Sequence, residues 1–82
     1  MEIESRLKQI FVDVFNTKAD KITLQTKQNE LEGWDSLGQL RIIMAVEESF
    51  NISFSIEEIA ALTTFERIMN KIEQNILLQK PD

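Results

Sequence analysis

The stretch from Gly33 to Leu37 reads G-W-D-S-L and places one serine where a polar segment meets an apolar-periodic one. If the second segment is a helix, Ser36 lies at its N-terminus. There the first backbone N–H groups have no intrahelical partner, and the helix dipole presents partial positive charge. A phosphate ester on the Ser36 hydroxyl would be stabilised by the same interactions that bind phosphates at other helix N-termini. The spacing is therefore suited to a covalent attachment through phosphate.

A purely structural interpretation of the same serine is available. Ser36 and Gln39 fit the capping-box pattern, in which a serine and a glutamine satisfy backbone donors at a helix start. Serine before an apolar run is most often a plain helix cap. The tripeptide D-S-L does not decide between these interpretations, so the surrounding sequence has to.

The composition excludes several kinds of chemistry. The chain contains no cysteine and no histidine. Disulfides, zinc sites built from thiolates or imidazoles, and Ser–His or Cys–His nucleophile pairs cannot form within it. The calcium-loop pattern of the EF-hand is also absent. We therefore predict no metal site and no enzymatic activity, and a reactive thiol would have to come from a covalent attachment.

The size and hydropathy favour one small globular domain. The chain has 82 residues, and we expect a single domain over 1–82 with an ordered core of about 2–78. No apolar run is long enough to span a membrane. Glu2 and Glu4 at the start are unlike the basic, then apolar, layout of a signal peptide. We therefore expect a cytoplasmic monomer.

Negative charge is concentrated in the middle of the chain. The net charge is −5, but residues 28–62 carry seven acidic side chains and one basic one, Arg41, which gives that segment a charge of −6. Such a field repels nucleic acid and anionic lipid and attracts partners with basic docking patches. An ordinary solvated helix surface is the alternative interpretation.

The apolar spacing predicts four helices and one long loop. From Ile3, apolar residues recur at helical spacing to Phe15, which predicts a first amphipathic helix. Residues 16–35 form a long connection, and such loops are often functional. We expect four side chains to fix this loop to the core, namely Ile22, Leu24, Leu31 and Trp34.

The second helix is predicted from Asp35 or Ser36 to Phe50, with Asn51 as a left-handed C-cap. One side of it carries Leu37, Leu40, Ile43, Met44 and Phe50, and Ile42, Ala45 and Val46 widen the apolar surface. Because more than half of its circumference is apolar, we expect this helix to contact neighbours on two sides.

Two further capping boxes predict the remaining helices. Ser55 and Glu58 begin a short third helix, and Thr63 and Glu66 begin the last one. The expected inner faces carry Ile56, Ile59, Ala60 and Leu62 in the third helix, and Phe65, Ile68, Met69, Ile72 and Ile76 in the last. Residues 79–82 are predicted to be a frayed tail. The predicted fold class is all-α, a small four-helix bundle with a long first loop and a short third helix.

The order of these elements resembles the acyl carrier protein family over nearly the whole chain. The most specific stretch runs from Gly33 to Thr64 and reads G-W-D-S-L-G-Q-L-R-I-I-M-A-V-E-E-S-F-N-I-S-F-S-I-E-E-I-A-A-L-T-T. D-S-L is followed by an apolar-periodic helix that ends in two glutamates and Phe50, then by a turn, a short acidic helix and Thr-Thr. The resemblance implies a bundle of the acyl-carrier type.

The resemblance also implies a function. A phosphopantetheinyl transferase would move 4′-phosphopantetheine from coenzyme A onto Ser36. The arm would carry acyl or aminoacyl groups as thioesters to loading and accepting enzymes of fatty-acid, polyketide, peptide or polysaccharide-type biosynthesis. Asp35 would shape the end of the loop, and Leu37 would anchor the helix start and meet partners. Further partner-binding residues would be Arg41, Glu47, Glu48, Glu57 and Glu58. The cargo pocket between the second and third helices would be lined by Met44, Val46, Phe54, Ile59 and Leu62.

Two positions depart from the carriers of housekeeping fatty-acid synthesis, which typically have acidic residues there. These positions hold Gly38 and Arg41. Arg41 reverses the charge on the side that would face partners, which changes partner preference. The resemblance is thus closer to specialised stand-alone carriers. The competing hypothesis is an unmodified acidic helical module that binds other proteins.

Overall fold

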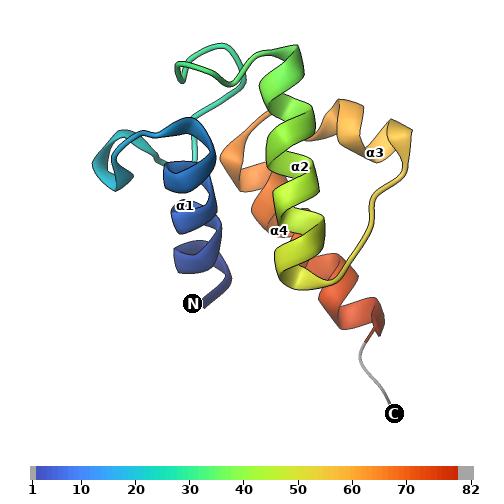
Figure 1. Cartoon of the computed structure of the whole chain (residues 1–82). Helices are drawn as coiled ribbons and strands as arrows, with labels where there is room; N and C mark the ends of the chain where they lie inside the picture. The colour runs from blue at the N-terminus through green and yellow to red at the C-terminus, as the bar shows by residue number, and fades with distance from the viewer. Residues whose placement is uncertain (1, 80–82) are drawn as a thin grey trace.

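The computed structural model describes residues 2–79 and contains four α-helices and one 3-10 turn within them. These elements are α1 (Glu2–Phe15), η1 (Ala19–Lys21), α2 (Ser36–Phe50), α3 (Ile56–Ala61) and α4 (Phe65–Gln79). Figure 1 shows α1 beside α2, with α4 behind them and the short α3 next to the upper half of α2. The predicted all-α bundle, its long first loop and its short third helix are confirmed.

Three of the helices share one apolar core. Each presents buried side chains to the others, and these are Leu7 and Phe11 of α1, Ile42, Ile43 and Val46 of α2, and Phe65, Ile68 and Ile72 of α4. Burial of large apolar side chains is the main stabilising contribution in a domain of this size. The short α3 contributes no fully buried residue, so its position depends on other contacts.

The residues that the spacing placed on one side of α2 do not all face the core. Leu37, Leu40 and Met44 are 61%, 52% and 68% exposed. The buried side instead carries Gly38, Gln39, Ile42, Ile43 and Val46. The widely apolar circumference of α2 therefore consists of one stripe that faces the core and one that faces solvent.

Both ends of α2 are capped by specific contacts. Asp35 is the N-cap, because its carboxylate accepts a hydrogen bond of 2.9 Å from the Gly38 N–H. At the C-terminus, the guanidinium of Arg6 donates to the carbonyl of Ser49 at 2.7 Å and lies 4.3 Å from the ring centre of Phe50. Asn51 has φ 56° and ends the helix in the left-handed conformation, as predicted.

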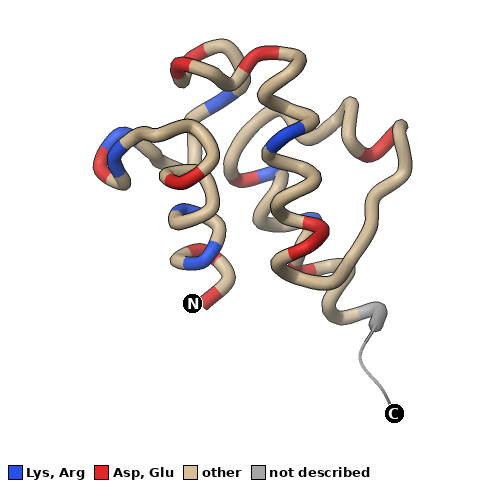
Figure 2. Tube along the Cα trace, viewed as in Figure 1, with Lys and Arg blue, Asp and Glu red and all other residues tan. Residues whose placement is uncertain are grey.

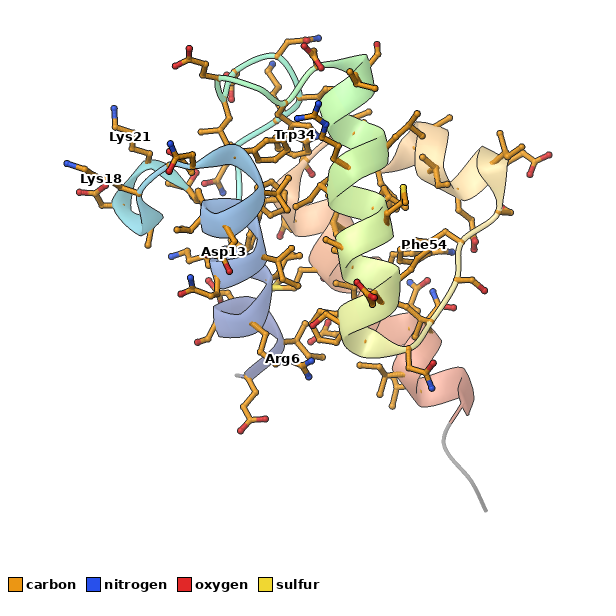
Figure 3. All side chains as sticks on the ribbon, in the orientation of Figure 1. Arg6, Asp13, Lys18, Lys21, Trp34 and Phe54 are labelled. Atoms are coloured by element: carbon orange, nitrogen blue, oxygen red, sulfur yellow. The ribbon has the colours of Figure 1, made fainter. Side chains whose placement is uncertain are left out.

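An aromatic cluster fixes the long loop to α1 and α4. The fully buried ring of Trp34 packs edge-on against Phe11, with 4.9 Å between ring centres, and is stacked near Phe15. Phe11 in turn contacts Phe65 of α4. Figure 3 shows Trp34 between the upper ends of α1 and α2. The expectation that Trp34 anchors the loop is confirmed, as it is for Ile22 and Leu31, which are also buried.

The start of α4 differs from its predicted capping box. The hydroxyl of Thr64, not of Thr63, accepts from the N–H of Arg67 at 3.0 Å. The N–H groups of Phe65 and Glu66 donate to the carbonyls of Thr26 and Leu24. The carbonyl of Leu24 thus satisfies the Glu66 N–H, which the hydroxyl of Thr63 was expected to satisfy. In the predicted tail, Gln79 belongs to α4, and residues 80–82 lie outside the described residues.

Two glycines bring the end of the loop onto the first turn of α2. Gly33 has φ 92°, a conformation that favours glycine. A Cβ atom added to Gly38 would fall closer than 3.0 Å to the carbonyl oxygen of Gly33 and would also press on the ring of Phe15. Gly38 is therefore required by packing, which is a physical reason for an uncharged residue directly after D-S-L.

We expect Gly38→Ala to lower the free energy of unfolding. Helix propensity alone would raise it by about 1 kcal/mol, but the overpacking against Gly33 costs about 1–3 kcal/mol. Urea denaturation of the wild type, of the variant and of the exposed control Gln74→Ala measures the sign of the change in the free energy of unfolding. A Gly38→Ala protein more stable than the wild type would contradict the close approach.

Candidate functional site

Ser36 is the first residue of α2 and is exposed to solvent. The preceding Asp35 binds the Gly38 N–H through its side chain and the Gln39 N–H through its carbonyl, at 2.8 Å. Among residues 2–79, no acceptor is bonded to the N–H groups of Ser36 and Leu37. An accessible hydroxyl next to free helix N-terminal donors is a geometry that fits a phosphate ester.

The alternative interpretation of Ser36 as a plain cap is wrong. Asp35 holds the cap position, and the side chain of Gln39 turns away from the helix start. Gln39 instead accepts from the indole N–H of Trp34 at 2.7 Å and donates to the carbonyls of Ile59 and Leu62. Since the Ser36 side chain is not needed as the N-cap of α2, its hydroxyl remains available for modification.

A groove opens beside Ser36 between α2 and α3. Its volume is about 370 Å³, and its wall is mostly apolar. Its lining consists of Gln28, Ser36, Gln39, Leu40, Ile56, Ile59 and Ala60. A flexible arm attached to Ser36 would start at this groove.

Exposed apolar side chains surround the groove. Leu37, Leu40 and Met44 recur at helical spacing on the solvent side of α2, and Ile56 of α3 is 82% exposed. The predicted inner position of Ile56 is therefore wrong. We call these four residues the apolar face. Contiguous exposed apolar surface in a small soluble domain marks an interaction site.

The predicted cargo residues are divided between the core, the surface and the groove beside Ser36. Val46, Phe54 and Leu62 are buried in the core, and Met44 lies on the surface. Of the five, Ile59 alone lines the groove beside Ser36. Figure 3 shows Phe54 on the linker into α3, next to the lower half of α2. The cargo role of these residues stays a prediction.

Two of the four predicted partner-binding glutamates bind within the domain. The carboxylate of Glu47 accepts from the Phe54 N–H at 2.8 Å and so holds the linker into α3. Glu58 forms the predicted capping box with Ser55 and an ion pair of 2.8 Å with Lys71 of α4. Both carboxylates have structural partners, which reduces the charge they offer to other proteins.

The remaining charges of this region are exposed. Glu48 and Glu57 point to solvent, and so does Arg41. Figure 2 shows one basic segment on α2, which by sequence is Arg41, above an acidic segment near the end of the same helix. The surface around the apolar face is therefore mixed in charge rather than uniformly acidic.

Sequence reasoning missed the role of Gln39. The sequence offered one signal, a polar amide within a helix that is apolar on most sides. The capping-box pattern had assigned this amide to the helix start instead. In the structure Gln39 is one of two polar residues buried among residues 2–77, together with Thr26. A buried amide requires hydrogen-bond partners, and Trp34, Ile59 and Leu62 supply them.

In the described part of the chain, no group of three or more acidic, histidine or cysteine side chains could hold a metal ion. Within residues 2–79, no helix is both long and apolar enough to cross a membrane.

Comparison with known protein families matches residues 5–72 to the family described as "PP-binding: Phosphopantetheine attachment site". The match covers most of the chain, and the chain belongs to this family. It is a non-catalytic carrier domain whose prosthetic group is 4′-phosphopantetheine, and it works with a phosphopantetheinyl transferase and partner enzymes. When attached, the arm supplies a thiol that carries acyl or aminoacyl groups as thioesters.

The Glu58–Lys71 ion pair predicts a pH dependence of the α3 attachment. The hydrogen bond from Lys71, assisted by the Ser55 N–H, lowers the pKa of the Glu58 carboxyl. A lowered folded-state pKa contributes stability at pH values above the ordinary glutamate pKa of about 4.3, and this contribution is lost as the pH falls through the lowered value.

We therefore expect Glu58→Gln to be less stable than the wild type at pH 7, with the difference shrinking below about pH 4.3. Urea denaturation across pH 3–7 checks this. The exposed neighbour Glu57 supplies the control, since Glu57→Gln should change stability little at any pH. A Glu58→Gln deficit that persists unchanged to pH 3 would contradict the ion-pair explanation.

Proposed function

We propose that Ser36 carries the phosphopantetheine arm. The observation that carries this proposal is the position of its hydroxyl, which is exposed at the first turn of α2 and is not used as the helix cap. The Ser36 and Leu37 N–H groups would bind the phosphate, and Asp35 would fix the helix start by holding the Gly38 N–H. The groove lined by Leu40, Ile56 and Ile59 would receive the part of the arm nearest the serine.

The apolar face is proposed as the surface on which the transferase and the loading and accepting enzymes dock. It adjoins Ser36, so an enzyme bound there would have its active site within reach of the arm. Glu48 and Glu57 would pair with basic groups at the rim. A monomeric state and a cytoplasmic location belong to the same proposal.

Arg41 supports a specialised pathway over housekeeping fatty-acid synthesis. It is exposed on α2 between Leu37 and Met44 of the apolar face. A basic side chain there lowers the attraction for a strongly basic partner and favours one with an acidic or neutral contact. Gly38 adds no argument on the pathway, because packing against Gly33 already requires it.

The arm attachment has a direct test. Incubation of the wild type with coenzyme A and a promiscuous phosphopantetheinyl transferase should add the mass of one phosphopantetheine group, and Ser36→Ala should abolish the gain completely. Intact-protein mass spectrometry measures both. A gain that survives Ser36→Ala would move the attachment to another residue, and the absence of any gain would favour the unmodified interaction module.

The charge of Arg41 has a second test with the same reaction. For a transferase with a basic docking surface, we expect Arg41→Glu to raise kcat/KM about 1.4- to fivefold at low ionic strength, the range for exposed charge pairs, and the gain to shrink as salt is added. Lys18→Glu makes the same charge change at the N-cap of η1, away from α2 and α3 (Figure 3), and should have less effect. Equal effects of the two variants would indicate net charge alone.

A further inference from the structure

The short helix α3 is attached to the domain by the partly buried Ile59, which packs against the core, and by polar contacts. It has six residues, none of them fully buried, and a helix of this length is not stable by itself in water. The close backbone contacts between helices join α1 to α2 and to α4. The contacts that hold α3 must therefore be found among its side chains and its terminal carbonyl groups.

Side chains from two other helices bind the C-terminal carbonyls of α3. Gln39 of α2 donates to the carbonyl oxygens of Ile59, at 3.0 Å, and of Leu62, at 2.8 Å. Arg67 of α4 donates to the carbonyl of Ala61 at 3.2 Å. The Ile59 and Ala61 carbonyls also accept from the backbone N–H groups of Leu62 and Thr63, whereas the carbonyl of Leu62, the C-cap of α3, accepts from Gln39.

The two attachments differ in their exposure. Arg67 is exposed, and its bond competes with solvent. Gln39 is buried, both of its amide hydrogens go to α3, and its oxygen accepts from the fully buried Trp34. A hydrogen-bond network withdrawn from water is the stronger constraint, because a partner left unpaired inside the protein is costly.

We propose that Gln39 is a positioning residue that holds α3 against α2 and thereby fixes the groove and the apolar face beside Ser36. The groove lies directly against it, since Gln39, Ile59 and Ser36 all line the same cavity. Widening the groove by moving α3 requires the two Gln39 bonds to break. Ile56, the α3 member of the apolar face, moves with that helix. The expected effect on the modification of Ser36 rests on the proposed function, whereas the role of Gln39 in holding α3 does not.

Native-state hydrogen exchange followed by NMR tests the geometry. Gln39→Met keeps the length of the side chain and removes all three hydrogen bonds. We expect the backbone amides of Ile59 and Leu62 to exchange at least tenfold faster relative to those of Phe11 and Ile72, as the loss of two hydrogen bonds implies. An equal increase in the exchange rates of all four amides, or no increase for the amides of Ile59 and Leu62, would overturn the proposal.

Trp34→Phe is the matched control. It removes the indole N–H but leaves both Gln39 bonds to α3. The smaller ring loosens the core, so all four amides should exchange faster together, with their ratio unchanged. A selective rise in α3 exchange for Trp34→Phe would assign the positioning to the tryptophan and overturn the role given to Gln39.

The wild type supplies a measurement that does not depend on the folding of a variant. The side-chain amide protons of Gln39 should exchange with the same opening free energy as the Ile59 and Leu62 amides, and faster than the Phe11 amide. Independent exchange of the side chain and of α3 would overturn the proposal.

The consequence for Ser36 is measured with coenzyme A and a transferase. We expect Gln39→Met to lower kcat/KM for Ser36 modification at least threefold and Trp34→Phe to lower it less. Equal values for wild type and Gln39→Met would overturn the link to the apolar face. If even the wild type is not modified, the proposed function fails, whereas the exchange data still decide whether Gln39 positions α3.

Discussion

The segment between α1 and α2 has no helix of its own beyond one 3-10 turn, and its end is held by the burial of a single indole ring. Trp34 packs on Phe11 and Phe15 of α1, and its N–H reaches Gln39 of α2. Asp35 and Ser36 follow directly along the chain. The buried ring therefore lies two residues before the start of α2, where Asp35 caps the helix and Ser36 is exposed to solvent.

Two kinds of interaction hold the helices of the domain together. The helices α1, α2 and α4 are joined by buried apolar side chains, whereas α3 is joined by the partly buried Ile59 together with an ion pair, a guanidinium and a glutamine amide. Apolar burial is non-directional and holds large surfaces together. Hydrogen bonds are directional and exchange with water at a modest net cost. The side of the groove formed by α3 thus depends on directional hydrogen bonds to a greater extent than the core of α1, α2 and α4 does.

The apolar spacing of the sequence was sufficient to predict the helices, because a repeat of three and four residues records which segments are amphipathic. It did not tell which of two apolar stripes on α2 faces the core. Leu40 and Ile43 have the same chemical character, yet one is exposed and the other is buried. Orientation depends on where α1 and α4 pack, and an isolated helix pattern does not contain that information.

The helix caps likewise differ in whether the local sequence is sufficient to predict them. The box at Ser55 was predicted correctly, because both of its partners lie within one short segment. At the start of α2, Asp35 and Ser36 both have a favoured cap residue type, and the outcome depends on Gln39. Its amide is bonded to Trp34 and to two carbonyls that lie 20 and 23 positions away along the chain. Contacts at such separations are set by the tertiary fold and have no local sequence signal. Ser36 was therefore recognisable as a candidate site from its neighbours in the sequence, but the structural role of Gln39 was not.

Trp34 is the only tryptophan of the chain. It is surrounded by other aromatic rings, and its N–H is bonded to the amide that also binds α3. The protein thus contains a built-in optical probe at the junction of the loop, α1 and α2. The wavelength and intensity of its fluorescence would report changes in polarity around this junction. Loading of the carrier could therefore be followed in real time without an added fluorophore.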